Sequence, residues 1–246
     1  VIFKRGRCIM PSLTAHQIKT IAIIAMLLDH IGWAFFDTFS FWGQILHLIG
    51  RITAPIMCFF IVQGYFHTHS FKKYFARLII FGFISHVPYV YFINGEITIF
   101  PFSVMYTLAL GLLAVYCLYR IKNEQSLTLA LAFIVILSIP GDWMYIAIAF
   151  CAAFYLYRDD FTKQCRAIAI ITIFMFIFQF LTKLIVGSSF LDALLGSGFQ
   201  LGIVLCLPIL KLYNGQRGGN ALSKWMFYVF YPLHLLILGF LRYGGI

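Results

Sequence analysis

Residues 18–33 read IKTIAIIAMLLDHIGW, an apolar run interrupted by Asp29 and His30. Such a run is typical of a membrane-spanning helix, because a bilayer core takes roughly 20 apolar residues in helical form. A charge at the bilayer centre costs about 2.5–3.5 kcal/mol, so a carboxylate beside an imidazole needs a reason to be there. The stretch therefore indicates the fold class, and its two polar residues indicate where function lies.

The composition of the whole chain supports the same fold class. Of its 246 residues, 62% are hydrophobic, 19% are aromatic and only 11% are charged, with a mean hydropathy of +0.94. Soluble domains carry about 25% charged residues, so this chain cannot cover itself with a charged surface. We interpret it as an integral membrane protein with membrane lipids as its surroundings.

The net charge of +10 does not indicate nucleic-acid binding. The basic residues form no continuous stripe and no basic–aromatic module of the kind that nucleic-acid-binding domains present. They lie between the apolar runs, as the loop charges that orient a membrane protein do. We expect no nucleic-acid partner.

The cysteines and the first residues give no further chemistry. No CxxC or Cys/His metal spacing occurs, so we expect free buried thiols and no metal site. The first apolar run follows the basic segment VIFKRGRCIM, and no small-residue cleavage site follows it. We interpret this run as a first membrane helix with a basic cytoplasmic lead. The six cysteines are Cys8, Cys58, Cys117, Cys151, Cys165 and Cys206.

Apolar runs of suitable length predict an all-α, polytopic membrane bundle of about nine transmembrane helices, with eight or ten as alternatives. The fifth and sixth runs are short, and the turn PGDW (140–143) between them could mark a re-entrant pair. No repeat or soluble domain is evident, so residues 1–246 form one predicted domain. The runs lie near 18–36, 42–66, 74–93, 103–119, 126–140, 143–157, 166–186, 199–213 and 225–243.

Basic residues predict the orientation of this bundle. With the N-terminus inside, every Lys and Arg falls in an inside segment except Arg51, Lys183 and Arg242. This bias agrees with the positive-inside rule. We therefore expect a multi-pass protein of the bacterial cytoplasmic (inner) membrane with a cytoplasmic N-terminus.

Several polar residues project to membrane depth in this topology. Arg51 lies near the middle of the second segment, with His47 one turn earlier on the same face. These residues could form a proton-transfer centre, in which a carboxylate fixes an imidazole tautomer. They could instead form a structural Asp–Arg clasp with histidines as interhelical hydrogen-bond donors. Neighbours on a helix point about 100° apart, so Asp29 and His30 need not share partners. The deep polar set comprises Asp29, His30, His47, Arg51, Gln63, His86, Gln179, Gln200 and His234.

Two predicted inside loops concentrate positive charge. HTHSFKKYFAR (67–77) contains His67, His69, Lys72, Lys73 and Arg77, and LYNGQRGGNALSK (212–224) joins Arg217 and Lys224 to a glycine-rich turn. Ordinary positive-inside charge explains both loops. Taken alone, the loops favour this explanation, and the alternative is a cytoplasmic mouth for an anionic, phosphate-bearing ligand. Gly215, Gly218 and Gly219 would let backbone amides approach phosphates, although this is no P-loop.

Three stretches of the sequence carry recognisable motifs. GRITAPIMCFFIVQGYFHTHSFKKYFARL (50–78) is similar to the pattern GR-x-x-x-P … GF-x-HT … Y-x-x-RL. MLLDHIG (26–32) precedes it, and LPILKLYNGQRG (207–218) with FYVFYPLHLLIL (227–238) follows it. With these stretches as opening motif, central block and closing pair, the chain resembles the TraX family of pilin acetylases. The turn GDWMY (141–145) keeps the family's aspartate.

The resemblance implies a polytopic inner-membrane acyltransferase that takes acetyl groups from cytosolic acetyl-CoA. The acceptor would be an amine or a hydroxyl, such as the N-terminus of a pilin-like protein or a cell-envelope glycan. By this likeness the motif residues become site candidates: Asp29, His30, Gly50, Arg51, Pro55, His67, Tyr74, Arg77, Asn214, Arg217, Tyr231, Pro232 and His234.

The hypothesis for the mechanism assigns roles to these residues. Asp29, His30, Arg51 and His234 would be catalytic, with His30 or His234 as base or acyl carrier and Arg51 near the oxyanion. His47, His86, Gln63 and Tyr231 would support them. The coenzyme would contact His67, Lys72, Lys73, Tyr74, Arg77, Asn214, Gly215 and Arg217.

Two other classes of protein stay open at this point. A proton-coupled secondary transporter could use the same buried Asp, Arg and His residues as a relay. Such transporters usually contain repeated halves with matching broken helices, and the sequence has no such symmetry. A structural partner in an envelope complex would use the cluster only to clasp helices. Binding and transfer of labelled acetyl-CoA would separate the three classes.

Overall fold

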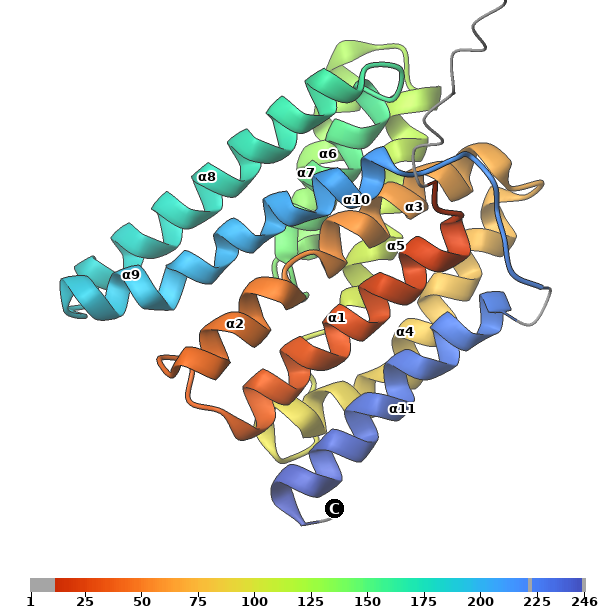
Figure 1. Ribbon diagram of the computed structural model, residues 1–246. Helices are drawn as coiled ribbons and strands as arrows, with labels where there is room; N and C mark the ends of the chain where they lie inside the picture. Colours follow the sequence, from red (N-terminus) through yellow and green to blue (C-terminus); the bar gives the residue numbers. More distant parts are fainter. Residues whose placement is uncertain (1–11, 221–222, 245–246) are drawn as a thin grey trace, which may run out of the picture.

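The structure, a computed structural model, describes residues 12–220 and 223–244. Within these ranges the chain forms a bundle of helices without named strands (Figure 1). The helices are α1 (Ala15–Phe35), α2 (Phe41–Gly50), α3 (Thr53–His67), α4 (Phe71–Asn94), α5 (Val104–Arg120), α6 (Glu124–Ser138), α7 (Met144–Leu156), α8 (Phe161–Ile185), α9 (Phe190–Gly198), the 3₁₀ helix η1 (Phe199–Leu205), α10 (Cys206–Lys211) and α11 (Ser223–Tyr243).

Each of the nine predicted segments corresponds to a helix or to a set of consecutive helices in the described chain. The second segment is the pair α2 and α3, and the eighth is the series α9, η1 and α10. The prediction of residue 199 as the start of the eighth segment is wrong, because the helical stretch begins at Phe190. Its first turns, FLDALLGSG, carry an aspartate, a serine and two glycines, which dilute the apolar signal.

Short polar residues define where many of these helices begin. A serine, threonine, asparagine or aspartate at the N-cap accepts a backbone N–H that the first helical turn leaves unpaired. Thr14 adds a complete capping box with Gln17. The caps therefore fix helix starts that apolar periodicity alone leaves vague. They are Thr14, Ser40, Ser70, Asn123, Asp160 and Ser189.

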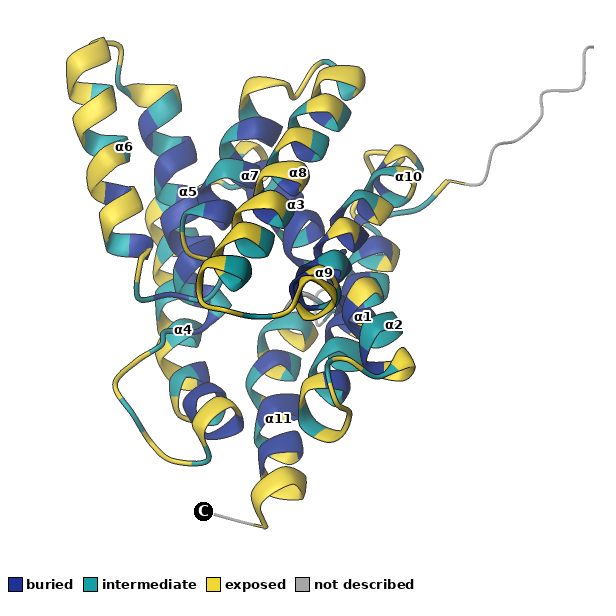
Figure 2. Cartoon of the chain, turned by 90° about the vertical axis from the view of Figure 1, so that its left-hand side faces the viewer, coloured by how far each residue is buried: buried dark blue, intermediate teal, exposed yellow. Residues whose placement is uncertain are grey.

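The apolar surface of the bundle faces outward, as it does in a protein surrounded by lipid. Helix α8 is 25 residues long and strongly apolar, yet little of its apolar stretch is buried. Ile170, Phe174 and Phe178 on this helix are all more than half exposed. Large exposed apolar areas are rare on soluble monomers. Figure 2 shows the complementary pattern, with the buried residues of α3, α5 and α7 gathered inside.

Six helical stretches of the described chain are long and apolar enough to cross a membrane. They are Ala15–Phe35, Phe41–His67, Phe71–Asn94, Phe161–Ile185, Phe190–Lys211 and Trp225–Tyr243. Helices α5, α6 and α7 are apolar but shorter. The chain is therefore a multi-pass membrane protein, and the predicted number of about nine segments agrees with its helices.

Helices α1 and α11 lie beside each other although they come from opposite ends of the chain (Figure 1). Helix α1 also packs against α2 and α3, while α11 packs against α4. The basic loops after α3, α5, α7 and α10 gather at one end, where α1 begins, and we call this the basic end. The loops after α1, α4, α6 and α8 lie at the other end, which we call the far end.

Candidate functional site

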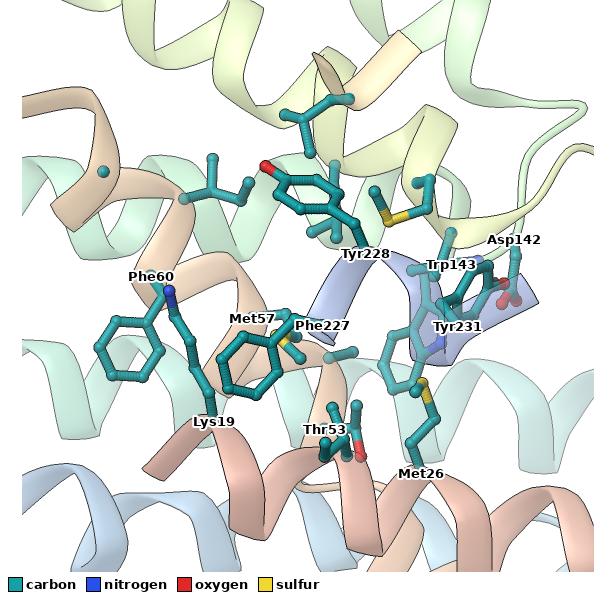
Figure 3. A pocket seen from close by; sticks show the side chains of 18 of the residues that line it. Lys19, Met26, Thr53, Met57, Phe60, Asp142, Trp143, Phe227, Tyr228 and Tyr231 are labelled. Atoms are coloured by element: carbon teal, nitrogen blue, oxygen red, sulfur yellow. Dashed lines mark hydrogen bonds between the residues drawn. The ribbon is translucent and has the colours of Figure 1, made fainter. Parts of the chain in front are cut away.

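A cavity of about 980 Å³ lies inside the bundle. Helices α1, α3, α4, α5 and α11 contribute to its wall, together with the turns at 67–69, 142–143 and 213–217. Along α1 its lining extends from Ala15 to Trp33, which is about 27 Å at 1.5 Å per residue. Figure 3 shows Lys19 toward one side of the cavity and Asp142, Trp143 and Tyr231 toward the other.

Asp29 is held by two cationic or hydrogen-donating groups at the break between α2 and α3. One carboxylate oxygen lies 2.5 Å from Nη2 of Arg51, and the other lies 2.8 Å from Nδ1 of His47. Because a carboxylate only accepts, both nitrogens donate. The predicted same-face placement of His47 and Arg51 is confirmed, but Arg51 lies at the end of α2 rather than inside one continuous helix. There its guanidinium reaches the cavity.

Gly50 is the residue that lets these two helices meet at Asp29. A Cβ atom added at position 50 would lie 2.2 Å from the Cβ of Asp29. No side chain fits at that separation, so the close approach of α2 to α1 depends on glycine here. His47 lies behind Asp29, fully buried, with its ring centroid 4.2 Å from that of Trp33. The ionic cluster is thus enclosed on the side away from the cavity.

His30 has a different partner, His234 of α11. Nδ1 of His30 lies 2.9 Å from Nε2 of His234, and Nδ1 of His234 lies 2.8 Å from the carbonyl oxygen of Phe230. The expectation that Asp29 and His30 serve different partners is therefore confirmed. His30 lines the cavity, whereas His234 is buried behind it.

The hydrogen bonds assign the tautomers of this pair. The Phe230 carbonyl accepts, so Nδ1 of His234 carries a proton and Nε2 of neutral His234 is an acceptor. His30 must then donate from Nδ1, which leaves the lone pair of neutral His30 on Nε2. His30 consequently combines contact with the cavity and a basic nitrogen, while His234 fixes its ring.

The basic end of the cavity contains three cationic side chains, Lys19, Arg77 and Arg217. Nζ of Lys19 lies 4.9 Å from the ring centroid of Phe60 and 5.7 Å from that of Phe227. His67, Tyr74 and Gly215 line the same region, as the sequence predicted. These groups give this end a positive charge suited to an anionic ligand.

The glycine-rich turn is fixed against the start of α1. The carbonyl oxygens of Gln216 and Arg217 accept the N–H groups of Ala15 and His16, at 2.8 and 3.0 Å. Gly215, Gly218 and Gly219 all have positive φ angles between 60° and 77°, a conformation that favours glycine. The glycines therefore shape a turn that closes on α1 and places Arg217 at the cavity.

Some predicted site residues lie away from the cavity. Lys72 and Lys73 are exposed on the first turn of α4 and do not line it. His86 also faces elsewhere, with Nε2 3.1 Å from the carbonyl oxygen of Thr98. Asn214 uses its side-chain oxygen to accept the N–H of Gln216. These four positions shape the surface and loops around the site. Gln63 and Tyr231 line the cavity as predicted.

Several cavity residues were not singled out as site candidates from the sequence, among them Lys19, Asp142 and Trp143. Lys19 could have been found from spacing, because Lys19, Met26 and His30 follow each other at seven and four residues and share one helix face. Asp142 and Trp143 belong to a turn whose approach to Arg51 depends on tertiary packing. The guanidinium carbon of Arg51 lies 5.3 Å from the Trp143 ring centroid.

Fold and site together define a polytopic helical membrane protein with a charged cavity between its helices. Residues 14–242 match the model of the TraX protein family, so the chain belongs to the TraX family. It is 31% identical to the probable fimbrial assembly protein FimC, serogroup H1, of Dichelobacter nodosus, across 92% of this chain and 94% of that protein. It is 25% identical to the uncharacterized protein RP591 of Rickettsia prowazekii (strain Madrid E), across 46% of this chain and 51% of that protein. No solved structure matches the chain.

Proposed function

We propose that this protein is a membrane acetyltransferase that moves an acetyl group from cytosolic acetyl-CoA to an amine or hydroxyl acceptor. The observation that carries the proposal is the cavity itself, which joins a cationic end to a buried imidazole. A CoA ester has phosphates at one end and a thioester at the end of a long flexible arm. Lys19 and His30 are eleven residues apart on α1, about 16 Å along the helix axis. The two ends of the ligand match the two chemistries of the cavity.

The coenzyme phosphates would bind at the basic end. Lys19, Arg77 and Arg217 would contact them there, with His67 and the backbone of Gly215 nearby. Arginine and lysine form strong charge-assisted hydrogen bonds with phosphate oxygens. The apolar walls between Lys19 and His30, among them Ile23, Met26 and Met57, suit the pantetheine arm. The thioester carbonyl would then reach His30 and Arg51.

His30 would act as the general base. As the acceptor nitrogen or oxygen attacks the acetyl carbonyl carbon, Nε2 of His30 takes its proton. The carbonyl oxygen becomes an oxyanion beside Arg51, whose buried Nε–H has no hydrogen-bond acceptor among the described residues. Collapse of this intermediate breaks the C–S bond, and the CoA thiolate takes the proton back from His30. The products are the acetylated acceptor and free CoA.

Asp29 and His234 would be positioning residues. Asp29 holds Arg51 and balances its charge, and His234 keeps His30 in the tautomer that bears a lone pair on Nε2. Neither needs to contact the substrate for these roles.

The distribution of charge supports one orientation of the protein in the membrane. The basic end carries Lys72, Lys73, Arg120, Arg158 and Lys211 outside the cavity as well as the cations within it. The positive-inside rule favours the cytoplasm for such an end, and acetyl-CoA is available there. We therefore propose a location in the bacterial inner membrane with a cytoplasmic N-terminus, with the acceptor reaching the site at or across the membrane.

The identity of the acceptor is suggested by a relative. The Dichelobacter nodosus protein is described as a probable fimbrial assembly protein, and the match spans nearly the full length of both chains. A subunit of a fimbria offers a free N-terminal amine. We propose a pilin-like N-terminus as the first acceptor to examine, with an envelope glycan as the hydroxyl alternative.

The test uses purified protein in lipid nanodiscs with acetyl-CoA labelled in the acetyl group. Saturable binding of acetyl-CoA and label transfer to a peptide bearing a free N-terminus would support the proposal. Proton-coupled solute uptake in vesicles without acetyl-CoA binding would overturn it in favour of a transporter. Neither binding nor uptake would leave a structural role. Label retained on the protein before acceptor is added would identify an acetyl-histidine intermediate.

Matched variants make the coenzyme site itself testable. Lys19→Ala and Arg217→Ala remove cations that line the cavity and should each weaken acetyl-CoA binding about tenfold, the loss of one charge-assisted contact. Lys72→Ala and Lys73→Ala remove cations from the same end that do not line it, and should leave binding almost unchanged. Equal losses in both pairs would mean that binding responds to general charge and not to the cavity.

A further inference from the structure

The turn between α6 and α7 brings a second carboxylate, Asp142, to the cavity wall. The turn is anchored to the loop before α5 by two backbone hydrogen bonds of 2.8 Å, from Phe102 N–H to Pro140 and from Asp142 N–H to Phe102. Its next two residues, Trp143 and Met144, have φ angles of 60° and 39°. Such left-handed backbone costs about 1–3 kcal/mol per non-glycine residue and is concentrated at functional sites. The surrounding contacts therefore hold this turn in an unfavourable conformation.

The Asp142 carboxylate lacks an ion-pair partner among the described residues. Arg51 forms its ion pair with Asp29, and His30 is hydrogen-bonded to His234. Asp142 accepts the N–H of Trp143 at 2.9 Å, and no described side chain forms an ion pair with it. A ligand with a positive charge would supply that partner.

Asp142 also borders a second pocket. This pocket has a volume of about 480 Å³ and shares Tyr89, Asp142 and Trp143 with the main cavity. Its other walls come from loops at the far end and are apolar or uncharged: Phe100, Pro101, Ile139, Pro140, Gly141 and Met144. The turn therefore lines both the acyl-transfer cavity and a second pocket, which lies on the side opposite the basic end.

We propose that Asp142 binds the ammonium group of the acceptor, and that the acceptor reaches the cavity through this second pocket. The inference rests on the proposed acetyl transfer to an amine and adds to it the residue that binds the amine and the route by which the amine enters. The N-terminus of a hydrophobic peptide has the required chemistry. Arg242, which lines another part of the far end, would repel an ammonium group and so favours the route beside Asp142.

The reaction balances with Asp142 in this role. One ammonium proton passes to the Asp142 carboxylate and then to solvent, which leaves a neutral amine. The amine nitrogen forms the C–N bond with the acetyl carbon and gives its second proton to His30. The C–S bond breaks, and the thiolate receives that proton. Burial raises the pKa of Asp142 to about 6, against the lowering effect of Arg51, so this carboxyl can exchange protons near neutral pH.

The test compares two peptides and two variants in nanodiscs. One peptide has a free N-terminal amine before an apolar segment, and the other has the corresponding α-hydroxy acid as its first residue. Asp142→Asn removes the charge but keeps an oxygen that accepts the Trp143 N–H, so the turn should fold. Asp37→Asn is the control, because Asp37 lies in a far-end loop and lines neither pocket.

We expect Asp142→Asn to raise the KM for the amine peptide about ten- to a hundredfold, the usual effect of losing a charged hydrogen bond, with the KM for acetyl-CoA unchanged. Asp37→Asn should change neither constant, and the hydroxy peptide should be a poor substrate that Asp142→Asn does not make worse. An unchanged KM for the amine peptide, or an equal loss with both peptides, would overturn the inference.

A direct binding measurement separates this inference from the proposed function. Equilibrium dialysis of the labelled amine peptide should show binding to the wild-type protein that Asp142→Asn weakens and Asp37→Asn does not. If acetyl transfer fails while this binding is observed, the proposed reaction is wrong and the ammonium site stands. If transfer is observed without any effect of Asp142→Asn on peptide binding, the reaction stands and the ammonium site is wrong.

Discussion

Asp29 and His30 are neighbours in the chain, but they belong to two different clusters. Asp29 points to α2 and forms an ionic cluster with Arg51 and His47. His30 points to α11 and forms a neutral pair with His234. Both residues line the cavity, so one turn of α1 presents a balanced ion pair and an uncharged base side by side.

The difference follows from how each group tolerates a poorly solvated site. A carboxylate that stays ionised at membrane depth needs a cation and hydrogen-bond donors, and the break between α2 and α3 supplies both. An imidazole can be neutral, so it needs no cation beside it. Helix α11 supplies a hydrogen-bond acceptor for Nδ1 of His30, which leaves the lone pair of Nε2 free. The first cluster therefore concerns mainly stability and electrostatics, and the second concerns proton transfer.

The largest expected effect is on the His30 side. His30→Ala should lower the rate of acetyl transfer by about 10²–10⁴, the usual contribution of a general base. Binding of acetyl-CoA should persist, since the cationic end is untouched. The control is His86→Ala, which removes a histidine that does not line the cavity. A His30→Ala protein that binds acetyl-CoA and transfers at the wild-type rate would remove His30 from the mechanism.

The Asp29 side should respond mainly in stability. Arg51→Ala leaves Asp29 buried without its cation, and breaking a buried ion pair costs about 3–5 kcal/mol. Denaturant unfolding in detergent measures this loss. The double variant Asp29→Leu/Arg51→Met removes both charges and should be more stable than Arg51→Ala alone. If the double variant is less stable than Arg51→Ala, the unpaired charge of Asp29 is not the source of the effect.

Gly50 supports the Asp29 cluster by allowing the close approach of α2 to α1. Gly50→Ala places a Cβ against Asp29 and should lower the free energy of unfolding by about 1–3 kcal/mol, as overpacking does. Gly198→Ala is the matched control, because nothing lies within 4 Å of its added Cβ. That change should be neutral or stabilise by up to about 1 kcal/mol. Equal destabilisation by both variants would argue against a specific contact at Asp29.

His234 is the second member of the neutral pair, and its role differs from that of His30. His234→Ala removes one hydrogen bond to His30, worth about 1 kcal/mol, and should lower kcat about fivefold. The KM for acetyl-CoA should not change, because His234 lies behind His30. A loss as large as that of His30→Ala would instead make His234 the base. An effect on the KM for acetyl-CoA alone would indicate a structural role in the cavity.

The pH dependence of acceptor binding isolates Asp142 from both clusters. Burial raises the pKa of the Asp142 carboxyl to about 6, while the nearby Arg51 lowers it and Asp29 raises it. Tyr89 and Tyr231 also interact with this carboxyl. Above this pH the group is ionised and binds an ammonium; as the pH falls through about 6 it becomes protonated. The KM for the amine peptide should therefore rise toward acidic pH in the wild-type protein. The same titration of Asp142→Asn should lack this rise.

The sequence predicted much of the fold because lipid imposes a simple rule on the chain. Apolar runs located each membrane segment, and the two basic loops located the connections at 68–70 and 212–220. The prediction was poorest where polar residues lie inside helical stretches. The start at Phe190 was missed because glycines and an aspartate resemble a loop. The break after Gly50 was missed because residues 42–66 form one long apolar run in which Arg51 is a single charged residue.

The candidate site was predicted in part, with a physical reason for each miss. Asp29, His30, Arg51 and His234 were found because ionisable groups at membrane depth are conspicuous in an apolar sequence. Lys72 and Lys73 were included because charge in a loop says nothing about which way a side chain points. The same limit hid Lys19, whose charge looks like an ordinary helix start until the cavity beside it is seen.

The amino-acid sequence is sufficient to identify a polytopic helical membrane protein of the TraX family. It also shows that Asp29 and His30 lie in the first helix, where burying polar groups in a membrane costs free energy. Hydropathy and motif order suffice for that conclusion, because they depend on local composition. The pairing of Asp29 with α2 and of His30 with α11 is visible only in the folded structure. The same holds for the position of Asp142, which has no ion-pair partner among the described side chains. Those pairings depend on which helices pack together and on the close approach that Gly50 allows, and neither is encoded in local periodicity.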